Sequence, residues 1–190
     1  MAKIIAFFKS LFAKKAPVQV VQPKPIETQP QKPQKPVEDQ KPVEQPKHDE
    51  PVVIDPTPWF TIAKKELGVK ETRGGETKRI LEYHASTTLK ATEDEVPWCS
   101  AFVTWCLKQA GYKSTESAWA RSYIGYGKKL DKPKPGCIVV FSRGPSSGHV
   151  AFFVKENLAT ITVLGGNQSD SVCYSEYAKY KVLAYVWPIK

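Results

Sequence analysis

The stretch that decides the fold runs from residue 137 to 164 and reads CIVVFSRGPSSGHVAFFVKENLATITVL. Its three apolar runs, at 137–142, 149–154 and 159–164, are separated by turn-forming residues, a pattern that predicts neighbouring β-strands. Alternation along the second run places His149 on the same face as the apolar side chains two and four residues later. Packing alone explains poorly why a histidine opens a core-lining strand, so we interpret His149 as a candidate functional residue.

The residues before these strands predict three helices. The first begins near Trp59, after a suitable capping threonine and a proline, and ends at Gly68. A second helical stretch covers residues 76–84. The third includes residues 101–110, and its apolar stripe indicates a buried helix with Cys99 in the first turn.

Cys99 has the surroundings of an activated thiol. Free backbone N–H groups and the positive dipole end of a helix N-terminus stabilise a thiolate. Cys106 lies two turns deeper on the same helix face, about 10 Å away at 1.5 Å per residue, which is too far for a disulfide with Cys99. We therefore interpret Cys106 as a small core side chain and Cys99 as a candidate nucleophile.

An amide is predicted to complete a Cys–His pair. The strand at 159–164 is followed by Gly165-Gly166-Asn167-Gln168, and pairing of this strand beside that of His149 would bring Asn167 or Gln168 near the imidazole. An amide in that place fixes the tautomer and orientation of the ring. The pattern favours nucleophilic catalysis at a carbonyl, with the histidine as base.

Charge and proline content divide the 190 residues into three parts. Residues 1–16 carry four lysines and no acid, residues 17–57 carry five lysines against seven acids, and residues 58–190 carry 19 basic against 12 acidic side chains. Eleven of the sixteen prolines lie between Pro17 and Pro58. We predict a basic head, a disordered Pro/Gln/Lys/Glu-rich linker and one compact domain with these boundaries.

The head, MAKIIAFFKSLFAKKA at residues 1–16, has the pattern of a basic amphipathic helix that lies in a membrane interface. A secretory signal peptide is the rival interpretation, although Lys9 interrupts its apolar stretch. A terminal helix that docks on nothing is a third. As an extended polyproline-like segment, residues 17–57 would span on the order of 100 Å.

Several classes are excluded or disfavoured by composition. No apolar run approaches the ~20 residues needed to cross a bilayer. The four cysteines form no CxxC motif and no ligand cluster typical of zinc, so no metal is predicted. The net charge of +9 comes from scattered lysines without a nucleic-acid reading motif, and no specific nucleic acid is expected as partner. Cys137 and Cys173 would pair only if their strands are adjacent, and we interpret them as free thiols.

Three motifs are recognisable when taken together: PWCSAFV at 97–103, SGHVAF at 147–152 and GGNQ at 165–168. They resemble the CHAP and NlpC-type peptidoglycan hydrolases, and in particular small CHAP-like proteins common in phages and prophages. The resemblance covers residues 59–188 and includes the WARS stretch at 119–122.

The resemblance implies a papain-like α+β fold, with N-terminal helices packed on an antiparallel β-sheet and with no cofactor. It implies cleavage of an amide in peptidoglycan, either at the sugar–peptide junction or within the peptide. Carried over, Cys99 is the nucleophile, His149 the base and Asn167 the orienting residue. Many CHAP enzymes have a carboxylate in this third position, so Gln168 and Asp170 remain alternatives to Asn167.

Four further side chains are candidates for binding substrate. Trp98 and Trp119 are large aromatic groups that stack on sugar rings when exposed, although such side chains are more often core or cleft wall. His84 is expected near a turn, where it would line the cleft, and Gln168 would contribute an amide. A surface or capping role is the alternative for His84.

The resulting expectation is a monomeric cysteine amidase or endopeptidase that acts on peptidoglycan, at the bacterial cell wall or periplasm. Phage-type lysis, as by an endolysin, or wall remodelling would be its setting, with residues 1–16 holding it to an anionic membrane surface. Two alternatives remain open: an interbacterial amidase toxin of similar fold, and a non-catalytic module that binds wall or membrane.

Overall fold

Six antiparallel strands pair into one sheet in the order β1-β6-β2-β3-β4-β5. The computed structural model describes residues 55–190. The strands are β1 (Lys128–Leu130), β2 (Ile138–Ser142), β3 (Gly148–Glu156), β4 (Thr160–Gly165), β5 (Cys173–Ala178) and β6 (Val182–Trp187). The predicted helix at 1–16 and nearly all of the predicted linker at 17–57 lie outside the described residues.

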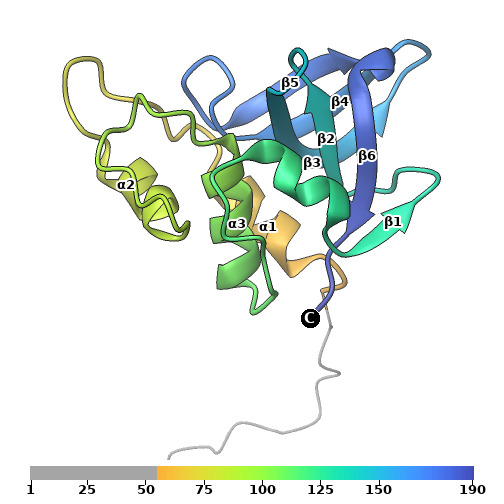
Figure 1. Ribbon diagram of the computed structural model, residues 1–190, viewed down its shortest axis with the longest axis horizontal. Helices are drawn as coiled ribbons and strands as arrows, with labels where there is room; N and C mark the ends of the chain where they lie inside the picture. Colours follow the sequence, from red (N-terminus) through yellow and green to blue (C-terminus); the bar gives the residue numbers. More distant parts are fainter. Residues whose placement is uncertain (1–54) are drawn as a thin grey trace, which may run out of the picture. The chain divides into compact units, whose positions relative to one another are not determined.

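Helices cover one face of this sheet (Figure 1). They are α1 (Pro58–Lys65), α2 (Lys78–Ala85) and α3 (Cys99–Gln109), and short 3-10 turns follow at η1 (Ala120–Gly125) and η2 (Lys179–Lys181). Helix α3 contacts β3 directly and has α1 and α2 on its sides. The α+β class predicted from the sequence, with helices packed on an antiparallel sheet, is therefore confirmed.

Both faces of the central strands are buried, because period-two alternation sends neighbouring side chains to two separate cores. On the helix side, Val150 and Phe152 of β3 join the apolar faces of α1 and α3. On the other side, Ala151 and Phe153 pack with residues of β2 and β4. The predicted alternation along this strand is confirmed, and it leaves His149 at the start of β3 on the side of the second core.

The central strands coincide with the apolar runs of the sequence, but two strands have no such run. The pairing of β3 with β4, which joins Phe152 to Leu164 and Phe153 to Val163, confirms the predicted neighbours. Strands β1 and β5 were not predicted, because β1 has only three residues and β5 is largely polar. Both are edge strands of the sheet, where burial imposes little pattern.

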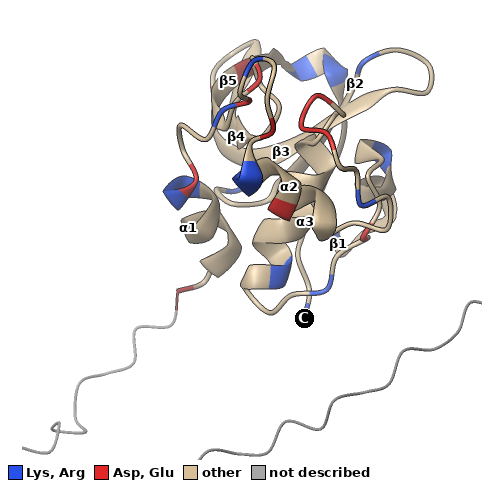
Figure 2. Cartoon of the chain, turned by 90° about the vertical axis from the view of Figure 1, so that its left-hand side faces the viewer, with Lys and Arg blue, Asp and Glu red and all other residues tan. Residues whose placement is uncertain are grey.

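Charge on the described unit is mixed rather than of one sign. Figure 2 shows Lys and Arg interspersed with Asp and Glu over the helices and strands. No helix within residues 55–190 combines the length and apolar character needed to span a membrane.

Candidate active site

Cys99 is the first residue of α3. The backbone N–H groups of the first helical turn have no acceptor within the helix and therefore point toward this end. The side chain of Cys99 is almost buried, with 7% of its surface exposed. The backbone N–H groups of Cys99, of Ser100 and of Val150 all stabilise its thiolate. The thiol thus lies where α3 meets β3, immediately beside the residue that follows His149.

His149 lies on β3 with its imidazole fully buried. Its Nε2 is 3.0 Å from Oε1 of Gln168, a hydrogen bond between the start of β3 and the loop after β4. Its Nδ1 has no hydrogen-bond partner among the described residues. Because the carboxamide oxygen can only accept, Nε2 carries the proton in the neutral ring and Nδ1 is the free base.

Gln168, rather than Asn167, is the amide that faces His149. Beyond β4 the chain turns through left-handed backbone at Asn167, where φ is 54°. This turn sends the amide of Asn167 toward Glu71, with Nδ2 3.4 Å from Oε1, and leaves Gln168 to face the imidazole. Asp170, the other alternative, is exposed and does not contact His149. Of the amides that the sequence offers for the orienting position, the one that contacts the imidazole is therefore that of Gln168, not that of Asn167.

Gln168 is itself held firmly. Its Nε2 donates to the backbone carbonyl of Cys173 on β5 at 2.5 Å, and its backbone N–H donates to the carbonyl of Ser171. These bonds use the amide nitrogen elsewhere, so the oxygen is the atom left for His149. The side chain is buried, with 2% exposed, and the substrate contact also expected of it stays a prediction.

Burial keeps both groups of the Cys–His pair neutral in the resting protein. It raises the pKa of Cys99, an effect opposed by the three backbone N–H groups and by the positive charge of Arg143. It also lowers the pKa of His149 to about 3, with the Arg143 charge acting in the same direction and the Gln168 hydrogen bond opposing it. In the resting state Cys99 is accordingly a thiol and His149 a neutral imidazole.

Two of the side chains predicted to contact substrate are buried. Trp98 is fully buried, and its Nε1 donates to Oε1 of Glu71 at 2.6 Å, so its ring is a core wall and cannot stack on a sugar. His84 is also fully buried, on α2, and burial lowers its pKa. Neither side chain reaches solvent, because the apolar faces of α2 and α3 pack against each other here.

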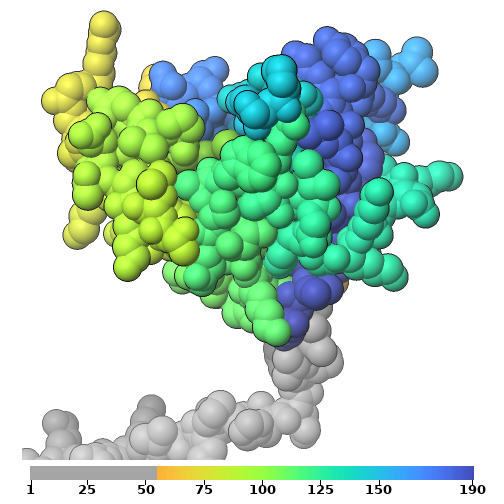
Figure 3. Space-filling model, viewed as in Figure 1, coloured from red at the N-terminus to blue at the C-terminus, as the bar shows by residue number. Residues whose placement is uncertain are grey.

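Trp119 is exposed, as substrate contact requires, and 56% of its surface is open. Its Nε1 donates to the carbonyl of Ser146 in the β2–β3 turn at 3.2 Å. Arg121 binds the same turn, with Nε donating to the carbonyl of Ser147 and Nη2 to that of Gly144. In Figure 3 this turn lies against the segment that contains η1. Hydrogen bonds from the WARS stretch therefore hold the turn that precedes His149 in place.

Sequence reasoning missed two side chains that surround the imidazole. Tyr177 of β5 stacks on His149, with ring centroids 5.1 Å apart and planes 25° from parallel. Arg143 donates from Nη2 to the hydroxyl of Tyr177 at 3.2 Å. The only available signal was the turn SRGPSSGH, in which an arginine precedes the histidine by six residues.

Glu71 connects the two halves of the site. It accepts from Trp98, which precedes Cys99, and from Asn167, which precedes Gln168. It also lines a surface pocket of about 380 Å³ whose other members are Lys70, Thr72, Arg73, Gly74, Asp94, Glu95 and Asp170. Burial and these neighbouring carboxylates raise the pKa of Glu71.

The remaining cysteines take no part in the pair. All four cysteines are free thiols, including Cys137 and Cys173, for which pairing had been the alternative. Within residues 55–190 no group of three histidine, cysteine or carboxylate side chains is arranged to hold a metal ion.

The segment that carries Cys99 and His149 is similar to a known protein family. Residues 91–167 match the family model described as the CHAP domain. The resemblance to CHAP domains drawn from the motifs is thereby confirmed. The matched CHAP segment contains Cys99 and His149 and ends one residue before Gln168. No curated protein matches the chain at a significant level.

CHAP domains are generally cysteine- and histidine-dependent peptidoglycan hydrolases, of the amidase or peptidase type. The match therefore indicates this general activity, with peptidoglycan as the substrate.

Proposed function

We propose that this chain hydrolyses an amide bond of peptidoglycan, with Cys99 as nucleophile, His149 as general base and Gln168 as the residue that orients the imidazole. The observation that carries the proposal is the state of His149. Gln168 binds one ring nitrogen at 3.0 Å, and the other is buried without a partner among the described residues. A nitrogen kept free in this way is available to take the proton of a thiol.

The reaction begins with proton transfer from the Cys99 thiol to Nδ1 of His149 as the sulfur attacks the carbonyl carbon. The carbon–nitrogen bond then breaks, the imidazolium returns its proton to the leaving nitrogen, and a thioester remains on Cys99. Water, deprotonated by His149, hydrolyses the thioester and releases a carboxylate. Because the resting pair is neutral, charge separation accompanies the attack rather than preceding it.

The N-terminus of α3 supplies the stabilisation that the tetrahedral intermediate needs. The N–H groups of Cys99 and Ser100 have no acceptor inside the helix and lie at the sulfur. They can donate to the oxygen that becomes negative when the carbonyl is attacked, and the helix dipole has the matching sign.

We place this activity at the bacterial wall or periplasm, in phage-type lysis or in wall remodelling. The basic amphipathic pattern of residues 1–16 and the proline-rich pattern of 17–57 support a tether to an anionic membrane surface, with the domain held at a distance from it. Deletion of residues 1–16 should then weaken sedimentation with anionic liposomes while leaving hydrolysis of soluble wall fragments unchanged. Equal sedimentation of both forms contradicts the tether.

Mass spectrometry of purified peptidoglycan after digestion tests the proposed reaction and identifies the bond. An amidase releases intact stem peptides from the glycan, whereas an endopeptidase releases peptide fragments with new amino termini. New reducing ends without new amines would indicate glycan cleavage and contradict the proposal. Protein that sediments with walls and releases nothing would instead be a binding module.

A further inference from the structure

The aromatic ring of Tyr177 forms one wall of the imidazole site. It lies 5.1 Å from the ring of His149 and 4.7 Å from that of Phe141, with planes within 27° of parallel in both pairs. Tyr177 comes from β5, and the other two come from β2 and β3, where Phe141 and His149 are directly paired across the strands. Because the ring of Tyr177 stacks on the imidazole, it restricts rotation of the imidazole out of its plane.

Arg143 contacts the same tyrosine. It follows the last residue of β2, and its backbone N–H donates to the carbonyl of Ser147, which closes the turn before β3. Its Nη2 donates to the Tyr177 hydroxyl at 3.2 Å. No carboxylate within residues 55–190 forms an ion pair with it. The guanidinium thus carries an uncompensated positive charge next to the Cys–His pair.

We propose that Arg143 and Tyr177 are positioning residues for the reaction: Tyr177 fixes the plane of the imidazole, and Arg143, held by its hydroxyl, places the positive charge that supports the thiolate of Cys99. The inference rests on the proposed function, because it takes Cys99 as the nucleophile. It adds a cation and an aromatic wall to a centre that otherwise contains only a thiol, an imidazole and an amide.

The charges that bear on Cys99 agree with this assignment. The Arg143 charge lowers the pKa of Cys99 and so offsets part of the effect of burial. The phenol of Tyr177 also interacts with Cys99, and its pKa is raised by burial. From the helices, Glu66 and Tyr83 bear on the next cysteine along α3, Cys106. On α2, His84 faces Asp94, not the thiol. Among residues 55–190, Arg143 is therefore the cation that acts on Cys99.

The test is a pH titration of the Cys99 thiolate by its ultraviolet absorbance, taken as the difference between each protein and its Cys99→Ser counterpart. In Arg143→Gln the ratio of thiolate to thiol should fall about fivefold when it is compared with wild type at one pH in the range where the thiolate absorbance rises. Arg143→Lys keeps the charge and should restore most of it. Tyr177→Phe keeps the stacked ring but loses the hydroxyl, and should give part of the Arg143→Gln effect.

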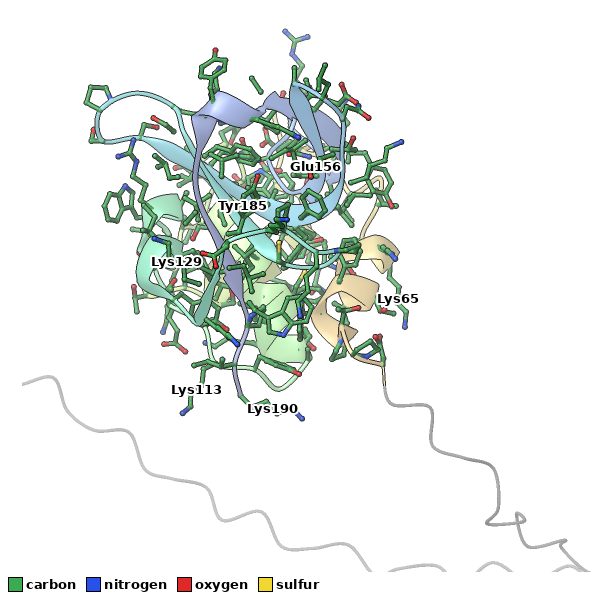
Figure 4. The ribbon with its side chains drawn as sticks, turned by 90° about the vertical axis from the view of Figure 1, so that its right-hand side faces the viewer. Lys65, Lys113, Lys129, Glu156, Tyr185 and Lys190 are labelled. Atoms are coloured by element: carbon green, nitrogen blue, oxygen red, sulfur yellow. The ribbon has the colours of Figure 1, made fainter. Side chains whose placement is uncertain are left out.

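Lys129→Gln is the matched control, because it removes an exposed cation on β1, at the sheet edge opposite β5 (Figure 4). A titration of Arg143→Gln that superimposes on the wild type overturns the proposal, as does an equal shift in Lys129→Gln. Circular dichroism of each variant confirms that the fold is intact. The titration needs no substrate, so it stands or fails separately from the proposed hydrolysis.

Discussion

The Oε1 of Gln168 lies 3.0 Å from Nε2 of His149, and it joins the loop after β4 to the start of β3. The bond holds one tautomer of the imidazole and leaves Nδ1 as the free base. An amide therefore does here what a carboxylate does in many proteins with a similar pair. It orients the ring without adding a negative charge that would favour the imidazolium.

Removal of the Gln168 side chain should lower the catalytic activity much more than it lowers the stability of the fold. We expect Gln168→Ala to lower kcat/KM on wall fragments by about 10²-fold, because the ring loses its orienting acceptor. Asn167→Gly is the control, since it removes the neighbouring amide while glycine tolerates the left-handed backbone at that position. Equal losses in the two variants would show that the loop, not the Gln168 contact, matters.

Gly166 should not accept a side chain. A Cβ there would lie 2.7 Å from Cβ of Phe102 and meet the ring of Trp98, both on the segment that carries Cys99. Gly166→Ala should lower the free energy of unfolding in urea by about 2–4 kcal/mol. Gly125→Ala, which places a Cβ in open space, should change it by less than about 1 kcal/mol. A stable, fully active Gly166→Ala would contradict this packing.

Stability should depend on pH through His149. Its folded pKa of about 3 lies below the unfolded value near 6.5, so the unfolded chain takes up a proton that the folded protein refuses. The free energy of unfolding should therefore fall as the pH falls from 6.5 toward 3, by up to about 1.4 kcal/mol per pH unit.

The variant His149→Asn isolates this contribution. It removes only the part of the pH dependence of the unfolding free energy that comes from His149, because the buried His84 and the carboxylates are still present. Denaturant titrations at several pH values between 7 and 4 give the two slopes. Identical slopes in wild type and His149→Asn would mean that the imidazole takes up its proton over the same pH range in the folded and the unfolded protein, which contradicts the lowered pKa.

Arg121 should control the order of the β2–β3 turn. Its guanidinium binds the carbonyls of Ser147 and Gly144, and Arg121→Ala removes both bonds. Amide hydrogen exchange across residues 143–148, followed by mass spectrometry, should become about tenfold faster. Arg73→Ala, which removes an exposed arginine elsewhere on the domain, should leave that exchange unchanged. Faster exchange in both variants would indicate a general loss of stability instead.

The sequence was sufficient for the elements with a local signal. The helix at Cys99 has a proline before it and an apolar stripe along it, and the His149 strand is bounded by turn residues, so both could be placed. Strand alternation could not place the third residue. It ends at Gly165, and the positive φ angles of Asn167, Ser169 and Asp170 then decide which amide faces the ring.

The surroundings of the site were less accessible to sequence reasoning, because they depend on contacts between distant segments. Tyr177 lies on a strand whose side chains are mostly polar and half exposed, which gives no reason to expect it at the imidazole. Trp98 and His84 have residue types common in binding sites, yet tertiary packing buries both.

The most direct test of the central claim compares two cysteines on the same helix. Cys99 and Cys106 are both buried on α3, and Cys99 alone adjoins Val150 and the helix N-terminus. The measurement is the rate at which purified peptidoglycan releases new amino groups. We predict that Cys99→Ala abolishes this release and that Cys106→Ala, once shown to be folded, retains it. Undiminished release by Cys99→Ala would contradict the account.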